Sequence, residues 1–275
     1  MKRTLLSLLI CSVCIFYATA RTERLSIPGD HGKLVAELQT PDAMTRKCPI
    51  VILCHGFTSN RNDGLMRGIA NALEAQGIAS IRFDFNGHGE SEGDFQQMTV
   101  PNEVEDANHI YQWVKADGRF GRIGIAGHSQ GGVVTAMLAG RLGKKALKGG
   151  VVLLAPAAVL RDDAIRGTIA GQPGDHGDPL DPPEYVEVWG HRLGRDYITT
   201  AFRLPIYETA AGYKGAACII HGTADRVVPY TYGLRFHQLW NGSEYHELNR
   251  FDHGFGPDPA QAVRLAIDFF TKQMK

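Results

Sequence analysis

The sequence predicts an α/β fold with a mostly parallel central sheet and helices on both faces. Short apolar runs alternate with segments whose apolar residues recur at helical spacing, and this alternation is typical of parallel sheets. Residues 50–54, Ile-Val-Ile-Leu-Cys, are apolar on both faces, as in a central strand that is covered on both sides. The 275 residues allow one large domain or two small ones, with ample chain for a buried core.

The charge balance and the first 20 residues indicate an exported protein that does not bind nucleic acid. Lys plus Arg and Asp plus Glu each number 29, so no excess of charge favours a nucleic-acid partner. Residues 1–20 combine two early cations, a compact apolar run and an A-x-A site that ends at Ala20. This pattern predicts a signal peptide, and hence a secreted or periplasmic protein, because the run is too short for a stable membrane span. The alternative is a retained N-terminal anchor.

Three of the five cysteines, Cys48, Cys54 and Cys218, lie beyond this leader. Cys54 and Cys218 belong to strongly apolar runs, where a free thiol packs as a small hydrophobic group. An odd number of cysteines argues against a disulfide framework, although a single bridge stays open in an oxidising compartment. We expect Cys48 to be the most exposed of the three.

The first half of the chain follows the predicted alternation. Residues 24–39 alternate weakly around a Pro-Gly turn and predict a hairpin at the edge of the sheet. The strand at 50–54 is followed by a predicted helix over about 63–76 and a strand over 78–83. A second helix is predicted over 101–115, because proline suits its first turn and its apolar residues form one stripe. The acids near its start, Glu103 among them, suit the helix dipole.

The second half resumes the alternation after one long interruption. Strands are predicted at 150–155, 216–221 and 244–248, and helices at 206–213, 232–240 and 258–273. Between the strand at 150–155 and the helix at 206–213, residues 157–204 carry clustered prolines and glycines without regular spacing. A loop this long is usually functional or disordered. Its aromatic residues Tyr185, Trp189 and Tyr197 argue against disorder, so we predict an inserted cap over the sheet.

Residues 122–132, RIGIAGHSQGG, contain the strongest functional motif of the chain. A short apolar strand leads into a G-x-S-x-G turn, and an apolar helix follows, which is the context of a nucleophile elbow. Glycines are needed at 127 and 131 because a Cβ there would clash in so sharp a turn. The motif therefore predicts Ser129 as an exposed nucleophile at the carboxyl end of the strand.

A serine nucleophile needs a histidine to take its proton and a carboxylate to orient that histidine. In this fold type the acid and then the histidine follow the serine along the chain. Asp225 comes directly after the strand at 216–221, and His253 lies in the loop before the last helix. His246 is the main rival, but it sits inside a strand. Asp258 is predicted to cap the last helix.

Acyl transfer also requires donors for the oxyanion that forms on the substrate. The backbone N–H of Gln130 directly follows the nucleophile, and the backbone N–H of Phe57 lies in the loop after the strand at 50–54. Both are main-chain donors, so we expect their side chains to be unimportant for this role.

A set of motifs spread over the chain resembles the cinnamoyl (feruloyl) esterases among the α/β-hydrolases. These motifs are CHGFTSN, RFDFNGHGES, GHSQGG, LLAPAA, LPIYE, HGTADRVVP and DHGF. The resemblance implies an α/β-hydrolase fold over residues 21–275 with a cap insertion at about 157–204. It implies the triad Ser129, Asp225 and His253, and hydrolysis of feruloyl, caffeoyl or p-coumaroyl esters from plant cell walls.

The same resemblance assigns roles within the cap. In such relatives an early aspartate and a late tyrosine of the insertion bind the phenolic hydroxyl, and the matching positions are Asp163 and Tyr197. A glutamine that assists in some relatives is replaced near Ala170. The alternative is that Asp163 and Tyr197 are solvated cap residues without a role in substrate binding.

The sequence thus predicts a serine esterase that acts through an acyl-enzyme, without a cofactor or a metal. The alternatives are a general short-chain carboxylesterase or a peptidase-like α/β-hydrolase. A third alternative is a binding protein without catalytic activity, but the presence of a nucleophile, an acid and a histidine argues against it. The sequence does not specify the natural ester or its alcohol, and it is compatible with a homodimer.

Overall fold

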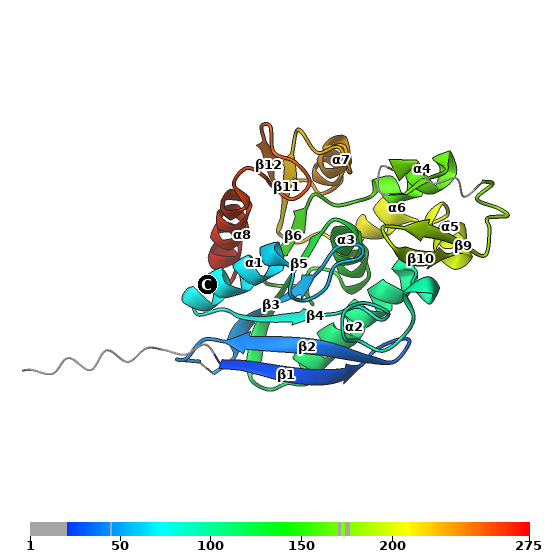
Figure 1. Ribbon diagram of the computed structural model, residues 1–275. Coiled ribbons are helices and arrows are strands. Elements are labelled where there is room, and N and C mark those ends of the chain that lie inside the picture. The colour runs from blue at the N-terminus through cyan, green and yellow to red at the C-terminus, as the bar shows by residue number, and fades with distance from the viewer. Residues whose placement is uncertain (1–20, 45, 170–171, 174–176) are drawn as a thin grey trace, which may run out of the picture.

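The computed structural model describes residues 21–44, 46–169, 172–173 and 177–275. The predicted signal peptide and Ala170 lie outside these residues. Within the described ranges, no helix is long and apolar enough to cross a bilayer. Figure 1 shows one central sheet with helices on both sides.

The central sheet has eight strands in the order β1-β2-β4-β3-β5-β6-β11-β12. Only β1 and β2 run antiparallel to their neighbours, and from β4 to β12 every pair is parallel. The strands are β1 (Arg21–Pro28), β2 (Lys33–Thr40), β3 (Cys48–Cys54), β4 (Ala79–Phe83), β5 (Phe120–His128), β6 (Val151–Leu154), β11 (Ala217–Gly222) and β12 (Glu244–Leu248). The predicted edge hairpin and the mostly parallel sheet are therefore confirmed.

Helices cover both faces of this sheet (Figure 1). The apolar residues of α1 (Gly64–Ala75) and α8 (Pro259–Gln273) share one core with one face of the strands. On the other face, α2 (Val100–Ala116), α3 (Gln130–Leu142) and α7 (Thr231–Leu239) contribute to the larger core. The short helix α6 (Ile206–Ala210) packs against α3. These two cores explain why the central strands are apolar on both sides.

The segment between β6 and α6 folds outside the central sheet. It contains two helices, α4 (Val159–Arg166) and α5 (Arg195–Ala201), and two small antiparallel sheets. The small sheets pair β7 (Thr168–Ile169) with β8 (Gln172–Pro173) and β9 (Tyr185–Val188) with β10 (His191–Gly194). In Figure 1 these elements gather at one end of the molecule, next to α2 and α3. The sequence showed no regular spacing here because such short strands leave almost no periodic signal.

The three described cysteines are all free and buried. The expectation that Cys48 is the most exposed was wrong, since its exposed fraction is 0%. Cys48 lies two residues before the predicted strand at 50–54, but in the structure it opens the central strand β3 and pairs with β5. Its Sγ faces the carbonyl oxygens of Pro49 and Gly77 at 3.4 and 3.7 Å.

Side chains cap two of the helices. Asp63 accepts from the backbone amides of the first turn of α1, and Thr99 accepts from the amide of Asn102 in α2. Asp258 does occupy the N-cap position of α8, but its side chain makes no capping bond. Its carboxylate instead accepts from Arg264 Nη2 at 3.0 Å, so the predicted position is confirmed but the side-chain capping bond is not made.

Candidate active site

Ser129 lies in a sharp turn between the end of β5 and the start of α3. Its backbone has φ 56° and ψ −123°, a strained conformation for a residue with a side chain. A Cβ on Gly127 would lie 2.1 Å from the carbonyl oxygen of Gly131, and a Cβ on Gly131 would lie 2.2 Å from that of His55. The predicted need for glycine at both positions is therefore confirmed by the close approach of backbone.

We expect Gly131→Ala to destabilise the fold by about 3 kcal/mol or more, because the contact is with rigid backbone rather than with a flexible side chain. The free energy of unfolding, measured by denaturant titration, checks this. Gly64→Ala is the matched control, since a Cβ at Gly64 meets nothing within 4 Å and the residue lies in a helix. Equal denaturation midpoints for the two variants would contradict the argument.

The structure brings Ser129, His253 and Asp225 into one hydrogen-bonded chain. His253 Nε2 lies 2.9 Å from Ser129 Oγ, and His253 Nδ1 lies 2.7 Å from Asp225 Oδ2. The three side chains come from the loops after β5, β12 and β11, because the carboxyl ends of parallel strands meet at one edge of the sheet. His246 lies within β12, and its Nε2 faces Glu244 instead.

Asp225 is buried, and all its interactions favour the ionised form. Its Oδ1 accepts from the amides of Val227 and Val228 at 2.9 and 2.8 Å. His221 Nε2 lies 3.3 Å from Asp225 Oδ2, while it also donates to the carbonyl of Val228 at 2.9 Å. Burial alone would raise the pKa of Asp225, but hydrogen bonds from His221 and His253 outweigh it and hold the pKa well below its usual range. The carboxylate can therefore stabilise an imidazolium at His253.

His128 anchors the loop that carries His253, a role that its position beside Ser129 did not suggest. Its Nε2 donates to the carbonyl oxygen of His253 at 2.9 Å. Burial and the charge of His253 lower the pKa of His128 to about 4, so the ring stays neutral. Asp252 shapes the same loop, since its carboxylate accepts from the amides of Gly254 and Gly256. These contacts fix the backbone on both sides of the His253 side chain.

The two predicted oxyanion donors lie beside Ser129. Phe57 and Gln130 both line the pocket that contains Ser129. In the part of the chain that the structure describes, neither backbone amide donates to another protein group. Both N–H groups are thus available to a substrate oxygen.

The loop that carries Phe57 is held by buried polar contacts. His55 Nε2 accepts from the amide of Phe85 at 3.2 Å, and burial lowers the pKa of His55 to about 4, so it acts as a neutral acceptor. The backbone amide of Arg61 donates to Asp84 Oδ1 at 2.6 Å, and its guanidinium pairs with the same carboxylate. The sequence did not indicate this anchoring, because Arg61 and Asp84 are distant in the chain.

The side chain of Gln130 has a structural role of its own, apart from the oxyanion role expected of the backbone amide. Its Nε2 donates to Glu103 Oε2 at 2.8 Å, and its Oε1 accepts from the hydroxyl of Tyr197 at 2.7 Å. Glu103 lies in the first turn of α2, as expected, but it is buried, and burial raises its pKa well above the usual range. Gln130 therefore links α2 to the cap helix α5 directly behind the oxyanion donor. The predicted substrate-binding hydroxyl of Tyr197 is engaged in this link.

A narrow pocket joins Ser129 to the cap. Asp163 lies 6% exposed at its wall, where Oδ1 accepts from Thr168 Oγ1 at 2.8 Å. Among the described residues, those that line the pocket are Phe57, Ser129, Gln130, Ala157, Val159, Leu160, Asp163, Ile169, Tyr197, Val227 and Val228. The structure thus places Asp163 and Tyr197, the two predicted substrate-binding residues, in one apolar pocket with the nucleophile.

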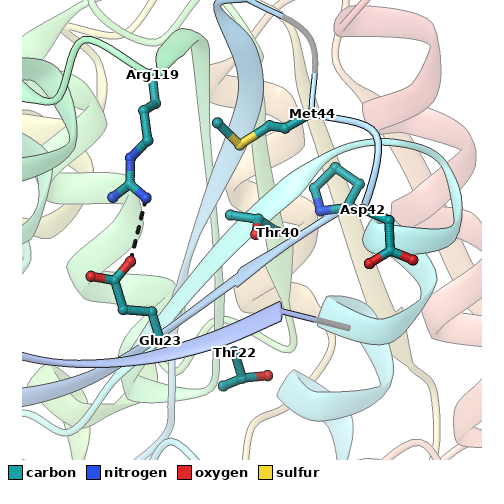
Figure 2. A pocket seen from close by; sticks show the side chains of 7 residues that line it. Thr22, Glu23, Thr40, Asp42, Met44 and Arg119 are labelled. Carbon is teal, nitrogen blue, oxygen red and sulfur yellow. Dashed lines mark hydrogen bonds and ion pairs between the residues drawn. The ribbon is translucent and has the colours of Figure 1, made fainter. Parts of the chain in front are cut away.

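A second hollow that also reaches Ser129 is lined by Trp189 and His253. Two spaces therefore border the nucleophile, which suits an ester with one group on each side of its carbonyl. A further pocket, shown in Figure 2, is lined by Glu23 and Arg119, which form an ion pair at 3.3 Å. Arg119 precedes β5 and Ser129 follows it, so this pocket lies at the opposite end of the strand from the triad.

With this fold and this elbow, the chain is an α/β-hydrolase. Est1E from Butyrivibrio proteoclasticus, solved with ferulic acid bound, matches with a TM-score of 0.85 at 25% identity, over 91% of this chain and 99% of that chain. The α/β-hydrolase GrgF from Penicillium sp. sh18 matches with a TM-score of 0.74 at 16% identity, over 92% and 99%. The second likeness concerns the fold alone.

Comparison of sequences finds similarity to a peptidase family, to a lipase and to an uncharacterized protein. The family described as "Serine aminopeptidase, S33" matches residues 45–171. Lysophosphatidylserine lipase ABHD12 of Gallus gallus is 26% identical over 208 residues, which cover 74% of this chain and 50% of that protein. An uncharacterized 31.7 kDa protein in the traX-finO intergenic region of Escherichia coli is 39% identical over 88 residues, covering 31% and 30%. The chain thus spans between about a third and a half of the length of these curated relatives.

Proposed function

We propose that this α/β-hydrolase is a serine esterase that cleaves hydroxycinnamate esters through an acyl-enzyme. Ser129 Oγ attacks the ester carbonyl while His253 Nε2 takes the hydroxyl proton. Asp225 keeps His253 in the required tautomer, and the amides of Phe57 and Gln130 stabilise the oxyanion. His253 then protonates the departing alcohol, and water activated by the same ring releases the acid and regenerates Ser129.

The observation that carries the substrate assignment is the pocket between Ser129 and the cap. Its walls are mostly apolar, yet they include a buried carboxylate, Asp163, which can accept a hydrogen bond from a phenolic hydroxyl. The ring of Phe57, in the same wall, lies 5.9 Å from the rings of both Tyr197 and Trp189 between centroids. The chemistry of this lining matches a flat aromatic acid that carries a phenolic hydroxyl, and the ferulic acid bound to the similar Est1E supports the same assignment.

A comparison of substrates tests the proposal against its alternatives. We expect kcat/KM to be higher for methyl ferulate than for p-nitrophenyl butyrate, and an aminoacyl amide to react poorly. Preference for the butyrate would favour a general carboxylesterase, and preference for the amide a peptidase-like enzyme. No turnover and no covalent adduct with a fluorophosphonate probe would indicate a binding protein without catalysis.

Removing the Asp163 carboxylate tests recognition of the phenol. We expect Asp163→Ala to lower kcat/KM about tenfold or more for methyl p-coumarate and to leave methyl cinnamate, which lacks the hydroxyl, nearly unchanged. Asp162→Ala is the matched control, because this neighbour bonds Tyr232 outside the pocket. Equal losses on both esters would mean that Asp163 only supports the cap.

The link from the cap to the oxyanion donor gives a smaller expected effect. Tyr197→Phe removes the hydrogen bond to Gln130 and should lower kcat/KM roughly two- to tenfold, which corresponds to about 0.5–1.5 kcal/mol. Tyr213→Phe is the control, since that hydroxyl bonds the carbonyl of Ala216 at 3.0 Å, far from the pocket. Initial-rate kinetics on methyl ferulate check both. The same kcat/KM in the two variants would remove the oxyanion link from the mechanism.

A further inference from the structure

Three potential metal ligands lie together on the last two strands of the sheet. Glu244 and His246 are two residues apart in β12, so both point to the same face of the sheet. Cys218 in β11 is the direct partner of Glu244 in the parallel register, and its side chain lies in the core shared with α8. The strand register therefore places a thiol, a carboxylate and an imidazole side by side.

The donor atoms of these three side chains already approach the spacing of a coordination shell. One atom from each lies within 4.8 Å of the others, and His246 Nε2 is 3.7 Å from Glu244 Oε2. Cys218 is fully buried, whereas the side chains of His246 and Glu244 are 31% and 36% exposed. An ion can thus enter from solvent on the His246 side and reach the thiol with small side-chain movements.

We propose that Cys218, Glu244 and His246 form a Zn²⁺ site separate from the catalytic centre. Sulfur, nitrogen and oxygen donors together favour Zn²⁺ over Ca²⁺ or Mg²⁺, which prefer oxygen alone. Three protein ligands leave the fourth tetrahedral position to water. The site lies near the starts of β11 and β12, whereas Asp225 and His253 follow the ends of the same strands.

The charges of the cluster suit a divalent ion, although the ammonium group of Lys272 also pairs with Glu244. The Cys218 thiol gives its proton to solvent on binding, so that thiolate and carboxylate together balance the two positive charges. Lys272 Nζ lies 2.9 Å from Glu244 Oε1, and this exposed ammonium opposes a cation at the site. Oε2 is the oxygen that faces His246. The ion therefore binds at Oε2 and weakens the contact with Lys272.

A bound ion would join the edge strand to the body of the sheet. β12 is the last strand in the order and pairs with β11. The loops after these two strands carry Asp225 and His253. Zinc at this position therefore stabilises the pair of strands that supplies the acid and the base, without contacting the reaction.

Cobalt titration of the purified protein tests the site independently of activity. We expect one Co²⁺ per chain to produce an intense thiolate-to-cobalt charge-transfer band together with tetrahedral d–d bands, both reversed by Zn²⁺. Cys218→Ser should abolish the thiolate band. Glu244→Gln and His246→Gln change half-exposed side chains, so we expect them to fold and to weaken binding about a hundredfold or more.

Two controls distinguish this site from adventitious binding. Lys272→Met removes the competing ammonium and should tighten Zn²⁺ binding about two- to fivefold, whereas Cys48→Ala should leave it unchanged. A hundredfold excess of Zn²⁺ over Kd should raise Tm by about 5–10 °C in the native protein and not in His246→Gln. Absence of the thiolate band at millimolar Co²⁺, or its persistence in Cys218→Ser, would overturn the proposal.

Discussion

Ser129→Ala is expected to lower kcat for ester hydrolysis by about 10⁶ and to abolish labelling by a fluorophosphonate. The alanine leaves the turn and the pocket intact but removes Ser129 Oγ, the nucleophilic atom that lies 2.9 Å from His253 Nε2. Loss of the nucleophile in comparable serine hydrolases costs about this factor, and the remaining rate comes from the oxyanion donors and from binding. Initial rates on methyl ferulate and intact-protein mass spectrometry after probe treatment are the measurements.

Ser243→Ala is the matched control for the nucleophile. Ser243 lies in the loop before β12, and its hydroxyl is hydrogen-bonded to His237 of α7. It lines neither of the two pockets at Ser129, so the variant should keep full activity and full labelling. A Ser129→Ala protein that still hydrolyses the ester within tenfold of the native rate would show that Ser129 is not the nucleophile. The assigned triad would then fail together with the proposed function.

Asp225→Asn is expected to lower kcat by about 10⁴ while KM changes little. The asparagine amide can donate to His253 Nδ1, which leaves the proton on Nε2 and makes that nitrogen unable to accept the proton of Ser129. The geometry itself should survive, since Asn retains an oxygen for the amides of Val227 and Val228. Asp258→Asn, which changes an exposed ion pair with Arg264, should leave kcat unchanged. A kcat for Asp225→Asn within tenfold of the native value would contradict this assignment.

The same substitution predicts a change in the pH dependence of stability. Because the pKa of Asp225 is held below its unfolded value of about 4, its ionised form stabilises the fold above that pH. This stabilisation is lost as the pH falls toward the folded-state pKa. The free energy of unfolding should therefore drop less between pH 6 and pH 3 in Asp225→Asn than in the native protein. Denaturant titrations at the two pH values measure the difference.

Local patterns were sufficient to predict most elements of the fold. The double-sided apolar strand at 50–54 and the amphipathic helix at 101–115 could be recognised because their periodicity depends only on residues near in sequence. The cap segment was less predictable, since the strands of its two small sheets are at most four residues long. The site was largely predictable for a topological reason: loops that follow parallel strands meet at one edge.

Other features of the site depend on contacts that no local pattern reveals. Glu103 looks like an ordinary acid in a first helical turn, yet it is buried against Gln130. His128 looks like a bystander of the elbow, yet it holds the carbonyl of His253. In both cases the partner lies far away in the chain, so only the packing of one element on another shows the interaction.

The sequence by itself determined the order of strands and helices, the glycines of the elbow, and the serine, acid and histidine that follow strand ends. These follow from short-range sterics and periodicity. Only the tertiary structure decided that Gln130 connects Glu103 to Tyr197, that Asp163 shares a pocket with Ser129, and that Cys218 meets Glu244 and His246. The physical reason is that such neighbours are set by sheet register and by the packing of distant elements, which periodicity along the chain does not contain.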